Sequence, residues 1–213
     1  MSSDSALLIP VRSFRGAKTR LDQLLDEDQR AQLAETMLGR TVAAAGRLEA
    51  FVVTGDPDVA RVAKNLGAQA IECTEPGLNI AVESGVDELQ RSGFGRVVVA
   101  HGDIPLVADL DHVGQPGFEG VVIVPDRRLD GTNVMSIPTG FDFRWCYGPG
   151  SFHRHRSEAL RLGLPLEVVC STALGWDLDE PEDLSGALER LPMELRRIVE
   201  TAPAIHQHTG DNN

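Results

Sequence analysis

An unbroken apolar segment, residues 6–11, lies near the start of the chain and passes directly into a loop of basic and small residues. A strand that is apolar at every position must be covered on both faces, as in the parallel sheets of α/β proteins. The loop carries Arg12, Arg15, Lys18 and Arg20, and leucines at helical spacing follow it. Because loop amides and helix N-termini after such strands hold phosphate groups, this segment predicts an anion site.

The charge of the chain narrows the class of ligand. Its formal net charge is −12 over 213 residues, and such a surface repels the phosphates of a polynucleotide. The expected ligand is therefore a small anion that meets the local basic loop. Three cysteines without a CxxC pair indicate a reducing compartment. No apolar run reaches the ~18 residues of a membrane span. We expect a cytoplasmic protein without nucleic-acid or membrane partners.

The rest of the pattern alternates strands with helices, which is typical of an α/β fold. We expect one domain over residues 6–200, flexible termini at 1–5 and 201–213, and a mostly parallel sheet flanked by helices. Segment 131–137 is expected to return beside 121–124. Other strands are expected at 51–54, 68–71, 96–100 and 166–170, and helices at 26–48, 60–66, 80–93 and 152–162, near 105, and from 181.

Carboxylates follow the predicted strands at positions where ligands bind in α/β sheets. Asp103 comes just after strand 96–100 and is either a magnesium ligand or the cap of a helix that begins near Pro105. Asp177 and Asp179 are two residues apart, so in an extended chain both carboxylates point the same way. Helix capping explains Asp179 alone but not the pair. Asp177 is therefore the second metal candidate.

Two polar segments offer hydroxyl and amide groups to an anion. Thr132 lies in a Gly-Thr-Asn sequence that enters a strand, although these residues disfavour strands. Ser151 follows Gly150 at a predicted helix start, where it is an N-cap, part of a second anion site, or both. Asn79 is either an ordinary helix residue or faces a nucleotide. The basic run 153–156 is interpreted mostly as a solvated helix face.

The order of these motifs is more specific than any one of them. The ordered set resembles the guanylyltransferases of coenzyme F420 biosynthesis, which act on 2-phospho-L-lactate or, in bacterial relatives, on phosphoenolpyruvate. The resemblance covers residues 6–190 and implies a single-domain nucleotidyltransferase fold, Rossmann-like and GT-A-like. After the basic loop, the motifs are Gly77-Leu-Asn79, Gly102-Asp-Ile-Pro-Leu106, Pro125-Asp-Arg127, Gly131-Thr-Asn133, Gly148-Pro-Gly-Ser151 and Asp177-Leu-Asp-Glu-Pro-Glu-Asp-Leu184.

The resemblance also implies a reaction and the residues for it. The family joins GTP to a phosphorylated three-carbon acid, releases pyrophosphate and uses Mg²⁺. Its product passes to a separate transferase of the same pathway. By motif, the nucleotide would be bound by Arg12, Lys18, Arg20 and Asn79, and catalysis would involve Lys18, Arg20 and Asp103. The metal would be held by Asp103, Asp177 and Asp179. Phosphoenolpyruvate would be bound by Thr132, Gly148 and Ser151.

Two departures from the family pattern bear on the acid pocket and the metal motif. Leu129-Asp130 stands where a smaller, glycine-containing turn is expected, and His101 stands where an apolar or small residue is usual. The alternative functions are another nucleotidyltransferase of this fold, of the molybdenum-cofactor or sugar-phosphate type, and a non-catalytic nucleotide-binding module. The first loop lacks closely spaced glycines, which argues against the former, and the metal-type carboxylates argue against the latter.

Overall fold

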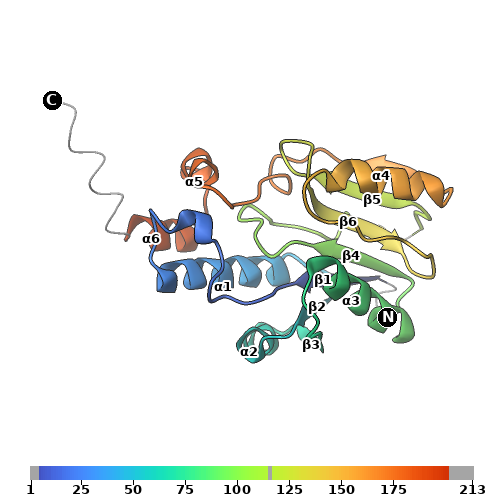
Figure 1. Ribbon diagram of the computed structural model, residues 1–213, viewed down its shortest axis with the longest axis horizontal. Helices are drawn as coiled ribbons and strands as arrows, with labels where there is room; N and C mark the ends of the chain where they lie inside the picture. Colours follow the sequence, from blue (N-terminus) through green and yellow to red (C-terminus); the bar gives the residue numbers. More distant parts are fainter. Residues whose placement is uncertain (1–4, 115–116, 202–213) are drawn as a thin grey trace.

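A single seven-stranded sheet with helices packed around it organises the molecule (Figure 1). The computed structural model describes residues 5–114 and 117–201. The termini that the sequence predicts to be flexible therefore lie outside the described residues, except for Ser5 and Thr201. Ser5 is the first residue of the first strand, and it pairs there with Arg96.

The helices and strands alternate along the chain much as the sequence predicts. The strands are β1 (Ser5–Pro10), β2 (Glu49–Thr54), β3 (Gln69–Glu72), β4 (Arg96–Ala100), β5 (Val121–Pro125), β6 (Thr132–Pro138) and β7 (Leu166–Val168). The helices are α1 (Glu27–Ala43), α2 (Pro57–Asn65), α3 (Leu78–Arg91), α4 (Ser151–Arg161), α5 (Pro181–Ala187) and α6 (Met193–Glu200), together with a short 3₁₀ turn, η1 (Thr19–Leu21).

The sheet has the strand order β3-β2-β1-β4-β6-β5-β7 and is mostly parallel. Strand β6 runs antiparallel to both of its neighbours, β4 and β5, whereas the other described strand pairs are parallel. The predicted return of segment 131–137 beside 121–124 is confirmed. Because β6 is reversed, its first residues, Thr132 and Asn133, lie at the edge where the parallel strands have their carboxyl ends.

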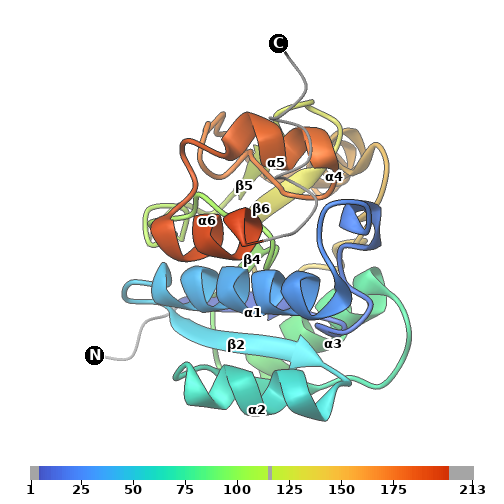
Figure 2. The same ribbon diagram turned by 90° about the vertical axis from the view of Figure 1, so that its left-hand side faces the viewer.

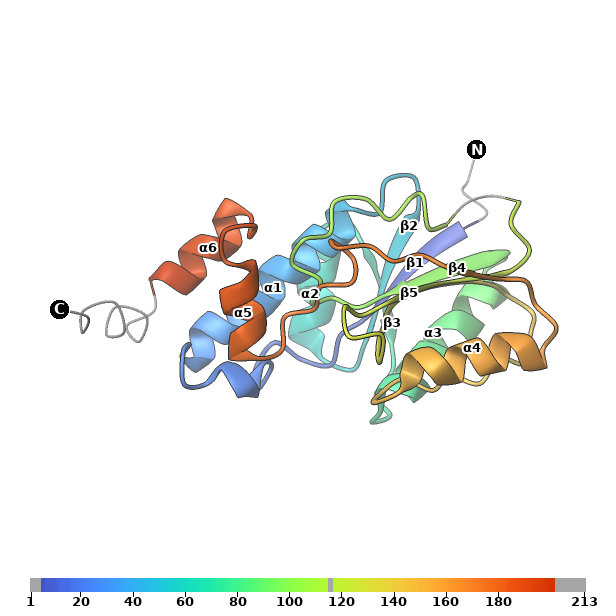
Figure 3. The ribbon, with the colours of Figure 1, turned by 90° about the horizontal axis from the view of Figure 1, so that it is seen from above.

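Both faces of the sheet are covered, as the apolar first strand predicts. Alternate residues of β1 serve opposite faces. Leu7 and Ile9 pack with residues of α1 and α2, whereas Ala6 and Leu8 pack with residues of α3. Figure 3 shows α3 and α4 on one side of the sheet. The predicted α/β architecture, a mostly parallel sheet flanked by helices, is confirmed.

Helix α6 packs on α1 beyond the end of the sheet, and α5 lies near α6 (Figures 1 and 2). A separate apolar cluster holds them there, and Met37 and Leu33 of α1 contribute to it together with Leu184 and Leu195. Met37 is fully buried. This packing fixes the segment that precedes α5, and that segment carries Asp177 and Asp179.

One predicted helix is absent, and one predicted helix end is wrong. No helix begins near Pro105, because residues 101–110 form turns and irregular chain that end with Leu110 N donating to Ala44 O. Helix α1 begins at Glu27 with Asp26 as its N-cap, as predicted, but it ends at Ala43 rather than at residue 48. Asp26 and Gln29 close its N-terminus with a reciprocal capping box, so this helix end offers fewer free amides to an anion than the sequence suggests. Among residues 5–114 and 117–201, no helix has the length and apolarity to span a bilayer.

Candidate active site

Lys18 reaches two carboxylates from distant segments of the chain. It lies in the loop after β1 in a left-handed conformation, with φ 52° and ψ 39°, which is uncommon for a residue other than glycine. Its Nζ donates to Asp103 Oδ2 at 2.7 Å and to Asp179 Oδ1 at 2.6 Å, and its side chain is 9% exposed. Burial alone would lower the pKa of Lys18, but the two carboxylates outweigh burial and raise that pKa.

Asp103 follows β4, and its carboxylate pairs with Lys18 rather than capping a helix. The capping interpretation of Asp103 is therefore wrong. Leu178 N donates to the carbonyl of Asp103 at 3.2 Å, which brings segment 177–179 beside it. Burial alone would raise the pKa of Asp103, but the charges of Lys18 and His101 and the hydrogen bond from Lys18 together outweigh burial and lower that pKa. Asp103 Oδ1 is buried and has no hydrogen-bond partner among the described residues.

The negative charge of Asp177 is less well neutralised by positive side chains than that of Asp103. Its Oδ1 lies 3.9 Å from Arg127 Nη1, which is too long for a hydrogen bond. Burial and the charges of nearby carboxylates, first Asp103 and then Asp179 and Asp183, raise the pKa of Asp177. Within the described part of the chain, no group of three His, Cys, Asp or Glu side chains has metal-site geometry. A lysine ammonium lies between two of the predicted metal ligands instead.

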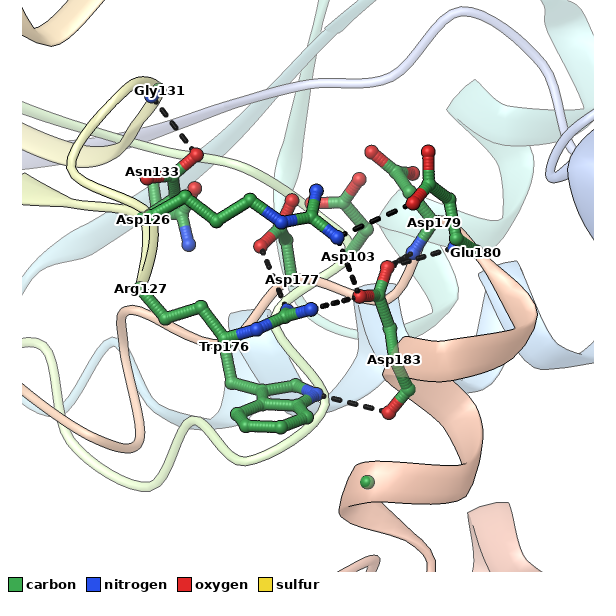
Figure 4. Close-up of polar contacts among 12 residues, drawn as sticks. Asp103, Asp126, Arg127, Gly131, Asn133, Trp176, Asp177, Asp179, Glu180 and Asp183 are labelled. Atoms are coloured by element: carbon green, nitrogen blue, oxygen red, sulfur yellow. Dashed lines mark hydrogen bonds and ion pairs between the residues drawn. The ribbon is translucent and has the colours of Figure 1, made fainter.

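Asp183 organises the loops around these carboxylates (Figure 4). It is fully buried, and its Oδ2 accepts the amides of Asp179 at 2.9 Å and Glu180 at 2.8 Å. Its Oδ1 accepts from Arg127, and from Arg128 at 3.3 Å. Burial alone would raise the pKa of Asp183, but these donors outweigh burial and lower it. A single side chain thus joins the start of α5 to the loop after β5.

Trp176 supports the same loop. The guanidinium of Arg127 lies over its ring at 4.3 Å from the centroid, and that of Arg190 lies at 4.2 Å. Its Nε1 donates to the carbonyl of Asp183 at 3.2 Å. Cation–π contacts of this kind hold the guanidinium of Arg127 in a defined place beside Asp177.

Two adjoining pockets open at the carboxyl ends of the parallel strands. The larger, about 670 Å³, lies over the ends of β1, β2 and β3, and the smaller, about 400 Å³, is lined by Lys18, His101 and Asp103. Both are lined by residues 10–13, which include Arg12. The two pockets therefore share one wall, and the smaller one reaches Asp103 and Asp179.

The other two residues predicted to bind the nucleotide, Arg20 and Asn79, form hydrogen bonds within the protein. Arg20 is 69% exposed and pairs with Glu180 at 3.2 Å. Asn79, in the first turn of α3, accepts from Tyr147 N at 2.6 Å and donates to Tyr147 O at 3.5 Å. Asn79 therefore holds the chain before α4, and its contact with a nucleotide stays a prediction.

The three predicted acid-binding residues belong to one hydrogen-bonded unit. Thr132 is buried, and its Oγ1 lies 3.0 Å from Nδ1 of His155 on α4. Ser151 is the first residue of α4, and its amide donates to Gly148 O at 3.0 Å. The N-cap is Gly150, so the N-cap interpretation of Ser151 is wrong. We refer to β6, α4 and the 146–150 loop as the β6–α4 unit.

The turn Leu129-Asp130, which departs from the family pattern, also supports the β6–α4 unit. Leu129 adopts φ 58°, the left-handed conformation that the expected glycine would take without cost. Asp130 accepts from Gly150 N through Oδ2 at 2.9 Å and from Phe152 N through its carbonyl at 2.9 Å. The turn thereby ties the loop before β6 to the start of α4.

His101 connects the smaller pocket with the β6–α4 unit. Its amide donates to Asn133 O at 3.0 Å, and its ring lies 5.2 Å from that of Tyr147. His101 Nε2 and the hydroxyl of Tyr147 are buried without a hydrogen-bond partner in the described part of the chain, as is Asp103 Oδ1. Unpaired buried polar atoms that gather at one place are typical of a site that a ligand completes.

Sequence reasoning missed several residues that hold the candidate site together. His155 is fully buried, so the interpretation of run 153–156 as a solvated face is wrong at this position. The spacing of Phe152, His155 and Ala159 could have placed His155 on the buried face of the helix. Arg127 and Asp183 lie within recognised motifs, but the sequence offers no sign that they pair across 56 residues.

The comparisons with known proteins agree with this architecture. A family model described as "Guanylyl transferase CofC like" matches residues 5–189. A relative named phosphoenolpyruvate guanylyltransferase, from Rubrobacter xylanophilus, is 37% identical over 185 residues, covering 84% of this chain and 90% of that protein. A relative named 2-phospho-L-lactate guanylyltransferase, from Methanothermobacter thermautotrophicus, is 33% identical over 183 residues, covering 83% of this chain and 81% of that protein.

A solved structure shares the fold. The cytidylyltransferase of Leptospira borgpetersenii superposes with a TM-score of 0.57 at 15% identity, covering 97% of this chain and 95% of that one. At this identity, the likeness concerns the fold alone. The predicted nucleotidyltransferase fold is confirmed.

Proposed function

The chain belongs to the guanylyl transferase CofC-like family, and from this premise we propose that it transfers a guanylyl group from GTP to phosphoenolpyruvate or 2-phospho-L-lactate, with release of pyrophosphate. The observation that carries the proposal is the cluster of Lys18, Asp103 and Asp177 beside two binding regions. One region is the pair of adjoining pockets, and the other is the β6–α4 unit.

The pockets suit a nucleoside triphosphate in one orientation. The base and ribose would occupy the larger pocket, and the phosphates would extend into the smaller one toward Lys18. Lys18 keeps its positive charge because Asp103 and Asp179 raise its pKa. Arg12 lines both pockets and is exposed, so it is available to the phosphates. A fixed ammonium is the kind of group that stabilises a departing pyrophosphate.

Asp103 and Asp177 fit a magnesium ion. Both offer carboxylate oxygens, the donors that this hard cation prefers. Asp103 Oδ1 is buried without a hydrogen-bond partner in the described part of the chain, and the pKa of Asp177 is raised by burial and then by the negative charges of nearby carboxylates. Bound there, the ion would neutralise phosphate charge. Asp179 is the weaker candidate because Lys18 already occupies its Oδ1.

The reaction requires no general base from the chain. A phosphate oxygen of the acid attacks the α-phosphorus of GTP, a new P–O bond forms, and the bond to the β-phosphate oxygen breaks. Both substrates are anions, so the task of the site is to hold them together and offset their charge. Lys18 and Arg12 would bind the triphosphate, and Thr132, Gly148 and Ser151 would orient the acid through neutral donors.

Phosphoenolpyruvate is the acid we favour, in line with the name of the relative at 37% identity. The two acids differ in the geometry of one carbon, and shape alone discriminates by about 1–3 kcal/mol. We therefore expect a preference rather than an absolute choice. The product is a guanylylated acid, and we propose that a separate transferase of coenzyme F420 biosynthesis consumes it in the cytoplasm.

An assay of pyrophosphate release tests the proposal. GTP, ATP, CTP and UTP are each supplied with phosphoenolpyruvate, 2-phospho-L-lactate or glucose 1-phosphate, and the product is identified by mass. We expect rapid release only with GTP and a three-carbon phospho-acid. Release with the sugar phosphate, or none with either acid, would remove the assignment. Equal amounts of the two acids in competition decide which one is preferred.

Asp103→Asn provides the catalytic control. This variant keeps the shape of the side chain but loses the charge that would hold the metal, and we expect turnover to fall at least ~100-fold. Circular dichroism checks that the variant is folded. A folded variant with near-normal turnover would show that Asp103 has no catalytic role.

A further inference from the structure

His155 contacts two parts of the β6–α4 unit at once. It lies in the first half of α4 and is fully buried. Its Nδ1 lies 3.0 Å from Thr132 Oγ1, and its Nε2 lies 3.0 Å from the backbone nitrogen of Cys146. The two ring nitrogens therefore join the start of β6 to the loop that carries Gly148.

The chemistry of these contacts fixes the proton on the ring. A backbone N–H can only donate, so His155 Nε2 must accept from Cys146 and carries no proton. A neutral imidazole then has its proton on Nδ1, which donates to Thr132 Oγ1. Burial lowers the pKa of His155 to about 4, so the ring remains neutral near pH 7.

This arrangement determines what the hydroxyl of Thr132 can do. The hydroxyl has one proton and two lone pairs, and Nδ1 of His155 uses one lone pair. The proton is then free to point away from His155. No other hydrogen-bond partner of the Thr132 side chain is found among residues 5–114 and 117–201. Thr132 is thus held as a donor, which is the role that an anionic ligand needs.

We propose that His155 is a positioning residue for the acid substrate, which orients the hydroxyl of Thr132 as a donor and holds the 146–150 loop against β6. The inference rests on the proposed function, because it takes Thr132, Gly148 and Ser151 as the acid-binding residues. All three are tied to His155: Thr132 through Nδ1, Gly148 through the loop that Nε2 anchors, and Ser151 through helix α4 itself.

Two isosteric variants separate the two contacts. In His155→Asn the side-chain amide can take the place of Nδ1 and still donate to Thr132, but the acceptor for Cys146 is lost. In His155→Gln the side-chain oxygen can take the place of Nε2 and still accept from Cys146, but the donor to Thr132 is lost. A hydrogen bond to a charged ligand is worth about 10- to 100-fold in affinity, so Thr132→Val sets the upper limit of the effect.

We expect His155→Gln to raise the KM for the acid about tenfold while the KM for GTP changes less than about twofold. His155→Asn should raise the KM for the acid by a smaller factor, because it loosens the loop that carries Gly148 but leaves Thr132 held as a donor. The double variant His155→Gln/Thr132→Val should be no worse than Thr132→Val alone, because both substitutions disable the same hydroxyl. Thr132→Ser keeps the hydroxyl and serves as the matched control.

Three outcomes would overturn the inference. They are a rise in the KM for both substrates in His155→Gln, additive effects in the double variant, or an Nε2-protonated His155 in nitrogen-detected NMR of the wild type. If His155→Gln does not fold, the NMR measurement and the pair Thr132→Val and Thr132→Ser still decide. A wild-type enzyme that forms no guanylylated acid would instead remove the proposed function, and this inference with it.

Discussion

The ammonium of Lys18 lies at the meeting point of three chain segments that no local pattern connects. Its left-handed backbone lets a loop residue reach both Asp103 and Asp179. Left-handed conformations of residues other than glycine cost about 1 kcal/mol, and such strain concentrates at functional sites. Burial of the pair Lys18–Asp103 requires that both partners stay charged. The lowered pKa of Asp103 contributes stability above the ordinary carboxyl pKa, and this stability is lost as pH falls through the folded-state value.

The basic loop yields the first prediction at this scale. Lys18→Ala should lower kcat about 100-fold or more, because it removes a buried cation aimed at the phosphates. Arg20→Ala should lower kcat less than about tenfold, because Arg20 is 69% exposed and pairs at the surface with Glu180. Steady-state kinetics with varied GTP measures both. Equal losses in the two variants would contradict the central position of Lys18.

Asp177 and Asp179 give opposite predictions for stability. The pKa of Asp177 is raised, so the folded state binds its proton more tightly than the unfolded state, and the ionised carboxylate destabilises the fold above that pKa. Asp177→Asn should therefore raise Tm by about 1–3 °C at pH 7.5 while it lowers activity. Asp179→Asn loses its contact with Lys18 and should lower Tm. Calorimetry of both variants checks the signs, and a lower Tm for Asp177→Asn would refute the argument.

Sequence reasoning placed its candidate site residues at one end of the sheet but did not predict their partners. The strand-to-loop transitions predicted the positions of Lys18 and Asp103, because a chain that leaves a buried parallel strand reaches the end of the sheet where ligands bind. The sequence did not reveal that Lys18 pairs with Asp179, 161 residues away, as well as with Asp103. Side-chain pairing at that separation depends on how the loops fold together, and periodicity carries no information about it.

At the scale of elements, the reversed strand β6 explains why an unusual Gly-Thr-Asn sequence begins a strand. Its antiparallel course places Thr132 at the carboxyl ends of the parallel strands, where its hydroxyl can meet a ligand, and the poor strand preference belongs to Gly131 and Asn133. The hairpin was predictable because 121–124 and 131–137 are short apolar runs joined by turn residues. The absence of a helix near Pro105 was not predictable, because Pro105 and Gly102 are compatible with a turn as well as with a helix start.

Asp183 carries the prediction at this scale. Asp183→Asn should lower the free energy of unfolding by about 2–4 kcal/mol, because it removes the buried charge that Arg127 and two backbone amides share. Hydrogen exchange should increase at the start of α5. Glu182→Gln removes the same charge from an exposed neighbouring position and is the matched control. Urea unfolding measures both variants, and equal small effects would mean that Asp183 is only a helix cap.

At the scale of the whole molecule, the two substrates would meet near the middle of the sheet, at the carboxyl ends of its parallel strands. The pockets lie over β1, β2 and β3, whereas the β6–α4 unit lies on the other side of β4. Asp103 follows β4 and so stands between the two halves. The apolar clusters around α3 and α4 keep both halves rigid against the sheet. This division predicts that the binding of each substrate can be weakened without weakening the binding of the other.

A crossed set of variants tests that division. Arg12→Ala should raise the KM for GTP and leave the KM for the acid nearly unchanged, because Arg12 lines only the pocket side of the sheet edge in the described structure. Ser151→Ala should do the reverse, because Ser151 belongs to the β6–α4 unit. Each loss should be about 10- to 100-fold, the range for one hydrogen bond to a charged group. Arg15→Ala, an exposed change in the same loop, is the control for charge. If either variant raises both KM values together, the substrates share one pocket and the division across β4 is wrong.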